Sequence, residues 1–100
     1  MVEKRSHRRV PLGAEVTCRR ADGSAFNGRG KDISVGGMFV EAAESVSFAE
    51  ELSIEVRLPG AKQSLALVAI VRWLGPGGFG VQFGLLGARE THAISEFYRG

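Results

Sequence analysis

Two short segments of this 100-residue chain carry residue types that could bind a phosphate-bearing ligand. The first runs from Lys4 to Arg9 and holds four cations in six residues, with arginines four apart at Arg5 and Arg9. A guanidinium offers a planar fork of donors that suits phosphate oxygens or the O6/N7 edge of guanine, and it can stack on a purine. Because a cationic tail is often merely solvated, this segment alone is a weak signal.

The second segment is a polar bend, from Asp32 to Gly37, that runs directly into an apolar strand. The carboxylate of Asp32 can accept two parallel hydrogen bonds, as from the N1–H and N2–H of guanine. Ser34, two residues on in extended chain, is expected on the same side. Gly36 and Gly37 lack Cβ atoms and would let the backbone approach a flat base. The purely structural alternative is an Asx turn with a glycine bulge.

Composition favours one small globular domain. One hundred residues suffice for a single core and are too few for two, and 44% apolar with 24% charged residues is not the composition of a disordered chain. Cys18 has no cysteine partner, so we expect it in the core, and the N-terminus lacks the apolar segment of a signal peptide. The longest apolar run, Leu65 to Val71, is too short for a membrane span. We therefore expect a cytoplasmic protein.

The net charge of +2 is unevenly distributed. Residues 1–40 hold eight Lys or Arg against four acidic residues, which gives +4, whereas residues 41–100 hold five against seven, which gives −2. A basic first half suits an anionic partner.

Alternation of apolar and polar residues predicts about six short strands joined by tight turns. Glycine or proline marks the turns at Asp22-Gly23, Pro59-Gly60 and 75–78. The predicted strands span residues 10–18, 25–31, 38–40, 52–58, 64–74 and 79–83, and the second of them is polar and glycine-interrupted, as in an edge or bulged strand.

Three further segments complete the predicted fold. The run from Ser64 to Leu74 is apolar on both faces, so we expect it to lie centrally and to be covered on both sides. Residues 45–51 form a loop or one helical turn. Within 88–99, apolar residues at i, i+3 and i+4 predict one amphipathic helix. Its apolar side is expected to pack against a sheet. These elements predict an antiparallel barrel or a closed sandwich.

In combination, the two segments resemble the motifs of the PilZ family of bacterial cyclic di-GMP receptors. Arg5-x-x-x-Arg9 precedes Asp32-x-Ser34-x-x-Gly37 by one hairpin, and no residue of either motif is missing. The resemblance covers essentially the whole chain, because it extends to Arg9-Val10-Pro11, Gly37-Met38-Phe39-Val40, Val71-Arg72-Trp73 and Gly80-Val81-Gln82-Phe83 before the final helix.

The resemblance implies a six-stranded antiparallel β-barrel of the split-barrel type, with one C-terminal α-helix, no catalytic activity and no cofactor. It implies cyclic di-GMP as the ligand, with its phosphates and guanines held by Arg5 and Arg9. Asp32 and Ser34 would bind a guanine, and Gly37 would give it room.

Four other residues are weaker candidates for the same ligand. Arg8 is an extra cation close to the phosphates, and Lys4 is a cation where a second ligand molecule could lie. Gly36 shares the bend. Trp73 could stack on a base, although a lone tryptophan on a strand is more often a core residue.

The expected organisation is a flexible ligand-binding lead-in, residues 1–9, ahead of one barrel domain, residues 10–100. Ligand binding would change the conformation of the lead-in and signal to a downstream protein that the sequence does not identify.

Other function classes find less support. His7, Asp32 and Ser34 are residue types of hydrolases, yet no oxyanion-hole motif, metal cluster or nucleophile elbow accompanies them, so we expect neither an enzyme nor a metal site. RNA binding calls for exposed aromatic residues among the cations, and Phe26 is the only candidate near the basic half. The main alternative is a PilZ-like module that binds a protein without cyclic di-GMP.

Overall fold

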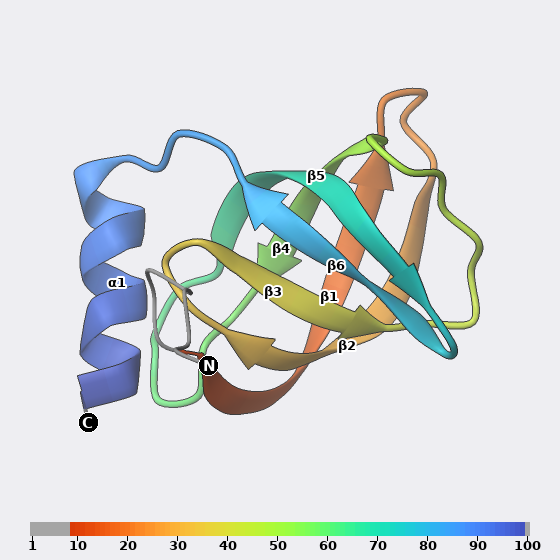
Figure 1. Cartoon of the computed structure of the whole chain (residues 1–100). Coiled ribbons are helices and arrows are strands. Elements are labelled where there is room, and N and C mark those ends of the chain that lie inside the picture. Colours follow the sequence, from red (N-terminus) through yellow and green to blue (C-terminus); the bar gives the residue numbers. More distant parts are fainter. Residues whose placement is uncertain (1–8, 100) are drawn as a thin grey trace, which may run out of the picture.

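The computed structural model describes residues 9–99, which form a closed antiparallel barrel with one helix beside it (Figure 1). The strands follow one another around the barrel in the order β1-β2-β3-β6-β5-β4. Their bounds, with that of the helix, are β1 Val10–Arg20, β2 Ala25–Ile33, β3 Gly37–Glu41, β4 Glu51–Val56, β5 Leu65–Gly75, β6 Gly78–Phe83 and α1 Ala88–Arg99. The barrel, rather than the sandwich, is therefore the correct prediction.

Turn chemistry explains where the hairpins close. In the β1–β2 turn, the Asp22 carboxylate accepts hydrogen bonds from the amide and the hydroxyl of Ser24, at 2.9 and 2.7 Å. These bonds hold the pKa of the Asp22 carboxyl below its usual range. The adjacent Gly23 has a φ of 92°, a conformation that side chains rarely adopt. Both glycine turns predicted for the long hairpins, at 22–23 and 75–78, are confirmed.

Several predicted boundaries differ from the structure by one or two residues. β2 continues to Ile33, so that Asp32 lies within the strand rather than in the bend. It is bulged but is not an edge strand, because it pairs with β1 on one side and β3 on the other. β4 ends at Val56, two residues before the predicted end. Residues 45–50 contain a turn and no helix.

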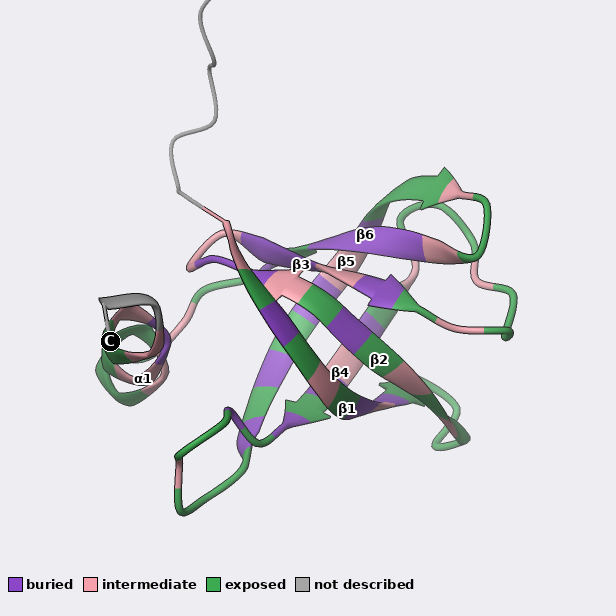
Figure 2. Ribbon diagram, turned by 90° about the horizontal axis from the view of Figure 1, so that it is seen from below, coloured by how far each residue is buried: buried purple, intermediate pink, exposed green. Residues whose placement is uncertain are grey.

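The core fills the inside of the barrel. Buried and exposed residues alternate along β1, β2, β4 and β5 (Figure 2), as expected for strands with one face inward. Cys18 is fully buried, as predicted, and burial raises the pKa of its thiol to about 11. Helix α1 contributes Ile94, which is fully buried, and Phe97, which packs against the core. Within residues 9–99, no helix is both long and apolar enough to cross a bilayer.

The outer face of β5 corrects the prediction that this strand is covered on both sides. Leu65, Leu67 and Ala69 point into the core, but Ala66 is exposed and Val68 keeps 51% of its surface accessible. A barrel has a single interior, so the other strands of the barrel bury only one face of β5.

Candidate functional site

Arg9 and Asp32 meet on the outer surface, where β1 begins and β2 ends. The Arg9 guanidinium donates to Asp32 Oδ1 at 2.9 Å, and the two side chains are 29% and 31% exposed. The antiparallel pairing of Pro11 with Asp32 brings these residues together although they are 23 positions apart in the chain. The structure therefore unites the described parts of the two motifs.

A β-bulge directs Asp32 outward. The register of β2 against β3 shifts between Gly30 and Asp32, which leaves Lys31 as an extra residue. Strict alternation from the buried Gly30 would turn Asp32 inward. The bulge instead keeps Asp32 partly exposed and buries Ile33 completely.

The carboxylate of Asp32 is held by two donors on one oxygen. Besides Arg9, the backbone amide of Phe39 donates to Oδ1 at 3.2 Å, across the β2–β3 pair. A carboxylate oxygen can accept about two hydrogen bonds, so Oδ1 is fully engaged in this conformation. A ligand with two parallel donors would have to displace one of these bonds.

Ser34 organises the bend between β2 and β3. Its hydroxyl oxygen accepts from the amides of Gly36 and Gly37, at 3.0 and 3.2 Å, and its own amide donates to the Gly37 carbonyl at 2.9 Å. The turn is thus built by the serine, whereas the Asx turn of the structural alternative would have used the aspartate. Ser34 is only 2% exposed, so in this structure it shapes the bend.

The two glycines of the bend have different surroundings. A Cβ on Gly37 would lie 2.2 Å from the carbonyl oxygen of Val81, so the close approach of β3 to β6 requires glycine at this position. This packing reason was missed at the sequence level, because it depends on which strand lies beside β3. Gly36 is partly exposed, and its carbonyl accepts from the Phe83 amide at 2.9 Å.

Trp73 lies on the outside of the barrel, and the alternative that it is a core residue is wrong. It is 54% exposed, and its ring contacts that of Phe39 with 5.5 Å between centroids. The cause is a second bulge: the register of β5 against β6 shifts between Val71 and Trp73, and the extra residue is Arg72. Plain alternation after the buried Val71 would have turned Trp73 inward.

Glycines on β5 and β6 make room for the two aromatic rings. Phe39 and Trp73 both pair with Gly80 of β6, one from each side. A Cβ on Gly78 would meet the Phe39 ring at 2.9 Å, and a Cβ on Gly75 would meet the Trp73 ring at 2.2 Å. Phe39, which the sequence did not single out as a site residue, thus links Asp32 to Trp73. Only the pairing of β6 with β3 and with β5 could have identified Phe39, and this pairing is a feature of the tertiary structure.

The remaining candidates cannot be placed. Lys4, Arg5 and Arg8 lie outside the described residues. Of the other cations in the basic half, Arg20 is engaged by Glu44, Glu50 and the Ser45 carbonyl, at the far end of β1 from Arg9.

Neither a metal site nor an aromatic surface for RNA is apparent in the part of the chain that is described. Residues 9–99 contain no group of three or more His, Cys, Asp or Glu that could hold a metal ion. Phe26 is partly buried between the ring of Phe79, at 6.2 Å, and the guanidinium of Arg20, at 5.2 Å. It is not a free stacking surface.

Comparison with known proteins identifies one family. The family model described as PilZ domain matches residues 3–100. A comparison with curated proteins returned no match.

Several solved structures share the fold. The inhibitor of motility MotI/DgrA from Bacillus subtilis is similar with a TM-score of 0.76 and 21% identity, covering 98% of this chain and 51% of that one. The PilZ domain of CeSA from a cellulose-synthesising bacterium has a TM-score of 0.72 and 23% identity, covering 92% and 96%. YcgR from Escherichia coli, in complex with c-di-GMP, has a TM-score of 0.82 and 19% identity, covering 98% and 46%. The chain thus spans about half of MotI and YcgR but nearly all of the isolated CeSA domain.

Proposed function

Because this chain belongs to the PilZ domain family, whose model matches residues 3–100, we propose that it is a receptor for cyclic di-GMP. It acts by binding and by a change of conformation, without catalysing a reaction. YcgR from Escherichia coli, which has the same fold, was solved with this ligand, and this supports the assignment.

The observation that carries the proposal is the contact between Arg9 and Asp32. The two motifs can bind one ligand only if they face the same patch of surface. A 2.9 Å ion pair joins Arg9 of the first motif to Asp32 of the second. The patch also offers opposite charges on adjacent side chains, as a guanine nucleotide requires: a donor for phosphate and an acceptor for the base.

The proposed contacts follow from these residue types. Arg5 and Arg9 hold the phosphates and the guanine O6/N7 edge, and Asp32 accepts from the N1–H and N2–H of a guanine. Ser34 contributes by fixing the bend that directly follows β2 and its Asp32. Gly37 allows the bend to lie close to β6, which leaves room above it for the base.

Four further residues extend the proposed site. Arg8 and Lys4 add cations for the phosphates of one ligand or of a stacked second one. Gly36, partly exposed in the bend, gives the base access to the backbone. Trp73, 54% exposed and packed on Phe39, offers a stacking surface on β5, which β3 and β6 separate from Asp32 on β2.

Binding would exchange partners at Asp32. In the structure, Arg9 and the Phe39 amide both donate to Oδ1. The guanine edge needs acceptors on both oxygens. Because the Phe39 amide is fixed in β3, Arg9 is the donor that leaves Oδ1 and moves to the ligand. Arg9 thus occupies the acceptor that the guanine would use. Its release from Asp32 couples ligand binding to the position of the chain ahead of β1.

The output would be a new surface. Residues 1–9 form the ligand-binding lead-in that closes over cyclic di-GMP, and residues 10–100 form the barrel that supports it. A downstream protein in the cytoplasm would recognise the closed form.

Isothermal titration calorimetry with cyclic di-GMP tests the proposal. Wild type should bind with micromolar or tighter affinity. Arg9→Ala and Asp32→Ala should each weaken binding by about tenfold to a hundredfold, because a charged hydrogen bond contributes roughly 1.5 to 3 kcal/mol. Arg19→Ala, near the far end of β1, is the matched arginine control and should bind as wild type does.

Other results would point elsewhere. No heat with the wild type would favour the module that binds a protein without cyclic di-GMP. Binding of RNA with a steep salt dependence and no sensitivity to Asp32→Ala would contradict the cyclic di-GMP site.

A further inference from the structure

The outer face of β5 carries an apolar ridge that the described part of the chain leaves uncovered. The ridge consists of Ala66, Val68 and Ile70, of which the first two are exposed and the third is partly buried. Neighbouring strands are polar or small at the facing positions, with Glu51, Ser53 and Glu55 on β4 and Gln82 on β6. A strand that is apolar on both faces is typical of one covered on both sides. We therefore expect another surface to cover the ridge.

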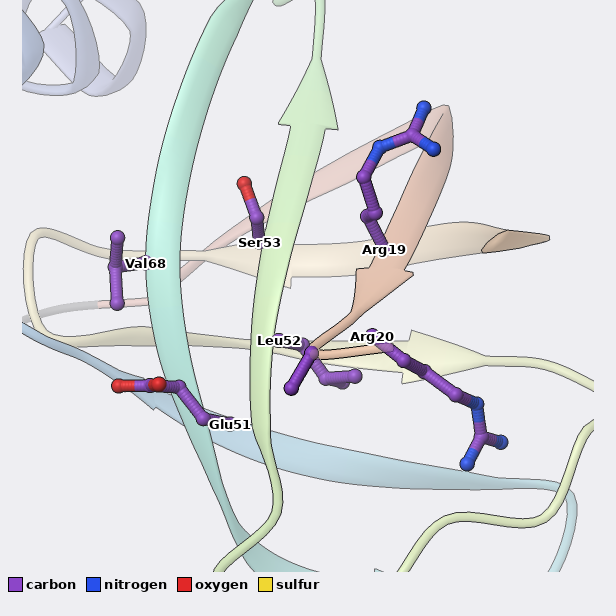
Figure 3. Close-up of a pocket in the computed structure, with 7 residues that line it drawn as sticks. Arg19, Arg20, Glu51, Leu52, Ser53 and Val68 are labelled. Atoms are coloured by element: carbon purple, nitrogen blue, oxygen red, sulfur yellow. The ribbon is translucent and has the colours of Figure 1, made fainter. Parts of the chain in front are cut away.

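The surroundings of Val68 allow another surface to approach closely. Ser53 pairs with Val68 on one side, and Gly84 donates its amide to the Val68 carbonyl on the other, at 2.8 Å. Both flanking residues are small, so Val68 stands above them. Figure 3 shows Val68 projecting from β5 beside Ser53, at a shallow pocket of about 280 Å³ whose lining also includes Arg19 and Glu51.

Charges of opposite sign flank the ridge. On the β4 side, Glu51 and Glu55 make no ion pair with any residue that the structure describes, and Figure 3 shows Glu51 extending from β4 towards β5. On the β6 side, Arg72 donates from Nε to Gln82 Oε1 at 3.0 Å, and its charge is likewise without an acidic partner among residues 9–97.

We propose that this ridge is a dimer interface, formed with a second copy of this chain about a two-fold axis that runs along β5. Such an axis lays the two ridges on each other, with Val68 against its counterpart, at the spacing of about 10 Å typical of packed sheets. It also exchanges the two sides of the ridge. Glu51 of each copy then faces Arg72 of the other, so the patch is complementary to itself, as an isologous contact must be.

The ridge is separate from the contact between Arg9 and Asp32. Arg9 and Asp32 lie between β1 and β2, whereas the ridge lies between β4 and β6 on the other side of the strand order. The contact surface is small, so a weak, concentration-dependent dimer is expected.

Sedimentation velocity on the 100-residue chain without nucleotide tests the interface. The mass should rise from 10.7 kDa towards twice that value as the concentration increases from about 10 µM to about 1 mM. Val68→Lys should raise the dissociation constant at least about tenfold, because it places two cations at the axis. Leu74→Lys is the matched control, since Leu74 is on the same strand and equally exposed, 50% against 51%. It should leave the dimer intact.

A charge exchange tests the orientation. Glu51→Arg alone and Arg72→Glu alone should each weaken the dimer, and the double variant should restore at least part of the loss. A wild type that stays monomeric over the whole range would overturn the proposal. So would a dimer that Val68→Lys leaves unchanged or that Leu74→Lys dissociates, because its interface would lie elsewhere.

Discussion

The guanidinium of Arg9 lies 2.9 Å from the carboxylate of Asp32, and the Phe39 amide donates to the same carboxylate oxygen. Each charged side chain keeps about a third of its surface exposed, so solvent screens their attraction. A partly exposed pair of this kind adds little to folding free energy. The pair should contribute instead to the free energy of binding a charged ligand.

Loss of Arg9 should therefore affect binding far more than folding. Arg9→Ala should change the free energy of unfolding by less than about 1 kcal/mol, while weakening cyclic di-GMP binding by about tenfold or more. Urea unfolding and calorimetry on the same samples measure both quantities. A large loss of stability with unchanged affinity would assign the pair a purely structural role.

Ser34→Ala should destabilise the fold. The substitution removes the acceptor of two amide hydrogen bonds at a position that is only 2% exposed. Leaving buried amides unpaired costs about 1 to 3 kcal/mol of unfolding free energy, which urea unfolding would detect. Ser53→Ala, a serine on the outer face of β4, is the control and should be nearly neutral. Equal stability of the two variants would mean that water replaces the lost acceptor in the bend.

Gly37→Ala should be more harmful than Gly80→Ala. A methyl group on Gly37 would lie 2.2 Å from the Val81 carbonyl oxygen, whereas on Gly80 its nearest neighbour would be 3.5 Å away, an ordinary contact. Because β3 and β6 would have to separate, we expect a loss of roughly 1 to 3 kcal/mol for Gly37→Ala and a smaller change for the control. Thermal unfolding of both variants gives the comparison, and a tolerant Gly37→Ala would show that the two strands can shift apart.

Trp73 should report on the ligand site. As the single tryptophan, and one that is 54% exposed, it should show solvent-exposed fluorescence that changes when a base stacks on it. Trp73→Ala should weaken binding by roughly 1 to 3 kcal/mol if the ring stacks on a base. Phe48→Ala removes another exposed aromatic ring, in the loop before β4, and should leave binding unchanged. An emission spectrum that saturating ligand does not alter would exclude Trp73 from the site.

Alkaline pH should destabilise the protein partly through Cys18. Burial raises the pKa of its thiol from 9.0 to about 11 in the folded state. A raised pKa means that the contribution to stability is complete below about pH 9 and is lost as the pH rises through about 11, because the unfolded chain releases the proton first. Urea unfolding at several pH values in this window should show a steeper decline for wild type than for Cys18→Ala. Parallel declines would indicate that the folded thiol ionises normally.

Local sequence determined most of the architecture. Alternation of apolar residues identified the strands, and glycine with aspartate or proline placed the turns, because strand period and turn conformation depend on neighbouring residues only. The terminal helix over 88–99 was likewise predicted correctly, since three apolar residues share one of its faces. The two motif segments could be named from residue type and order alone.

Tertiary structure decided which way the critical side chains point. Asp32 and Trp73 face outward because an extra residue precedes each, Lys31 in β2 and Arg72 in β5, and a bulge becomes visible only against the partner strand. The burial of Ser34 and the need for glycine at 37 also arise from contacts with distant strands. The apolar outer face of β5 was visible in the sequence, but only the tertiary structure shows that this face lies outside the closed barrel, because a barrel has one interior.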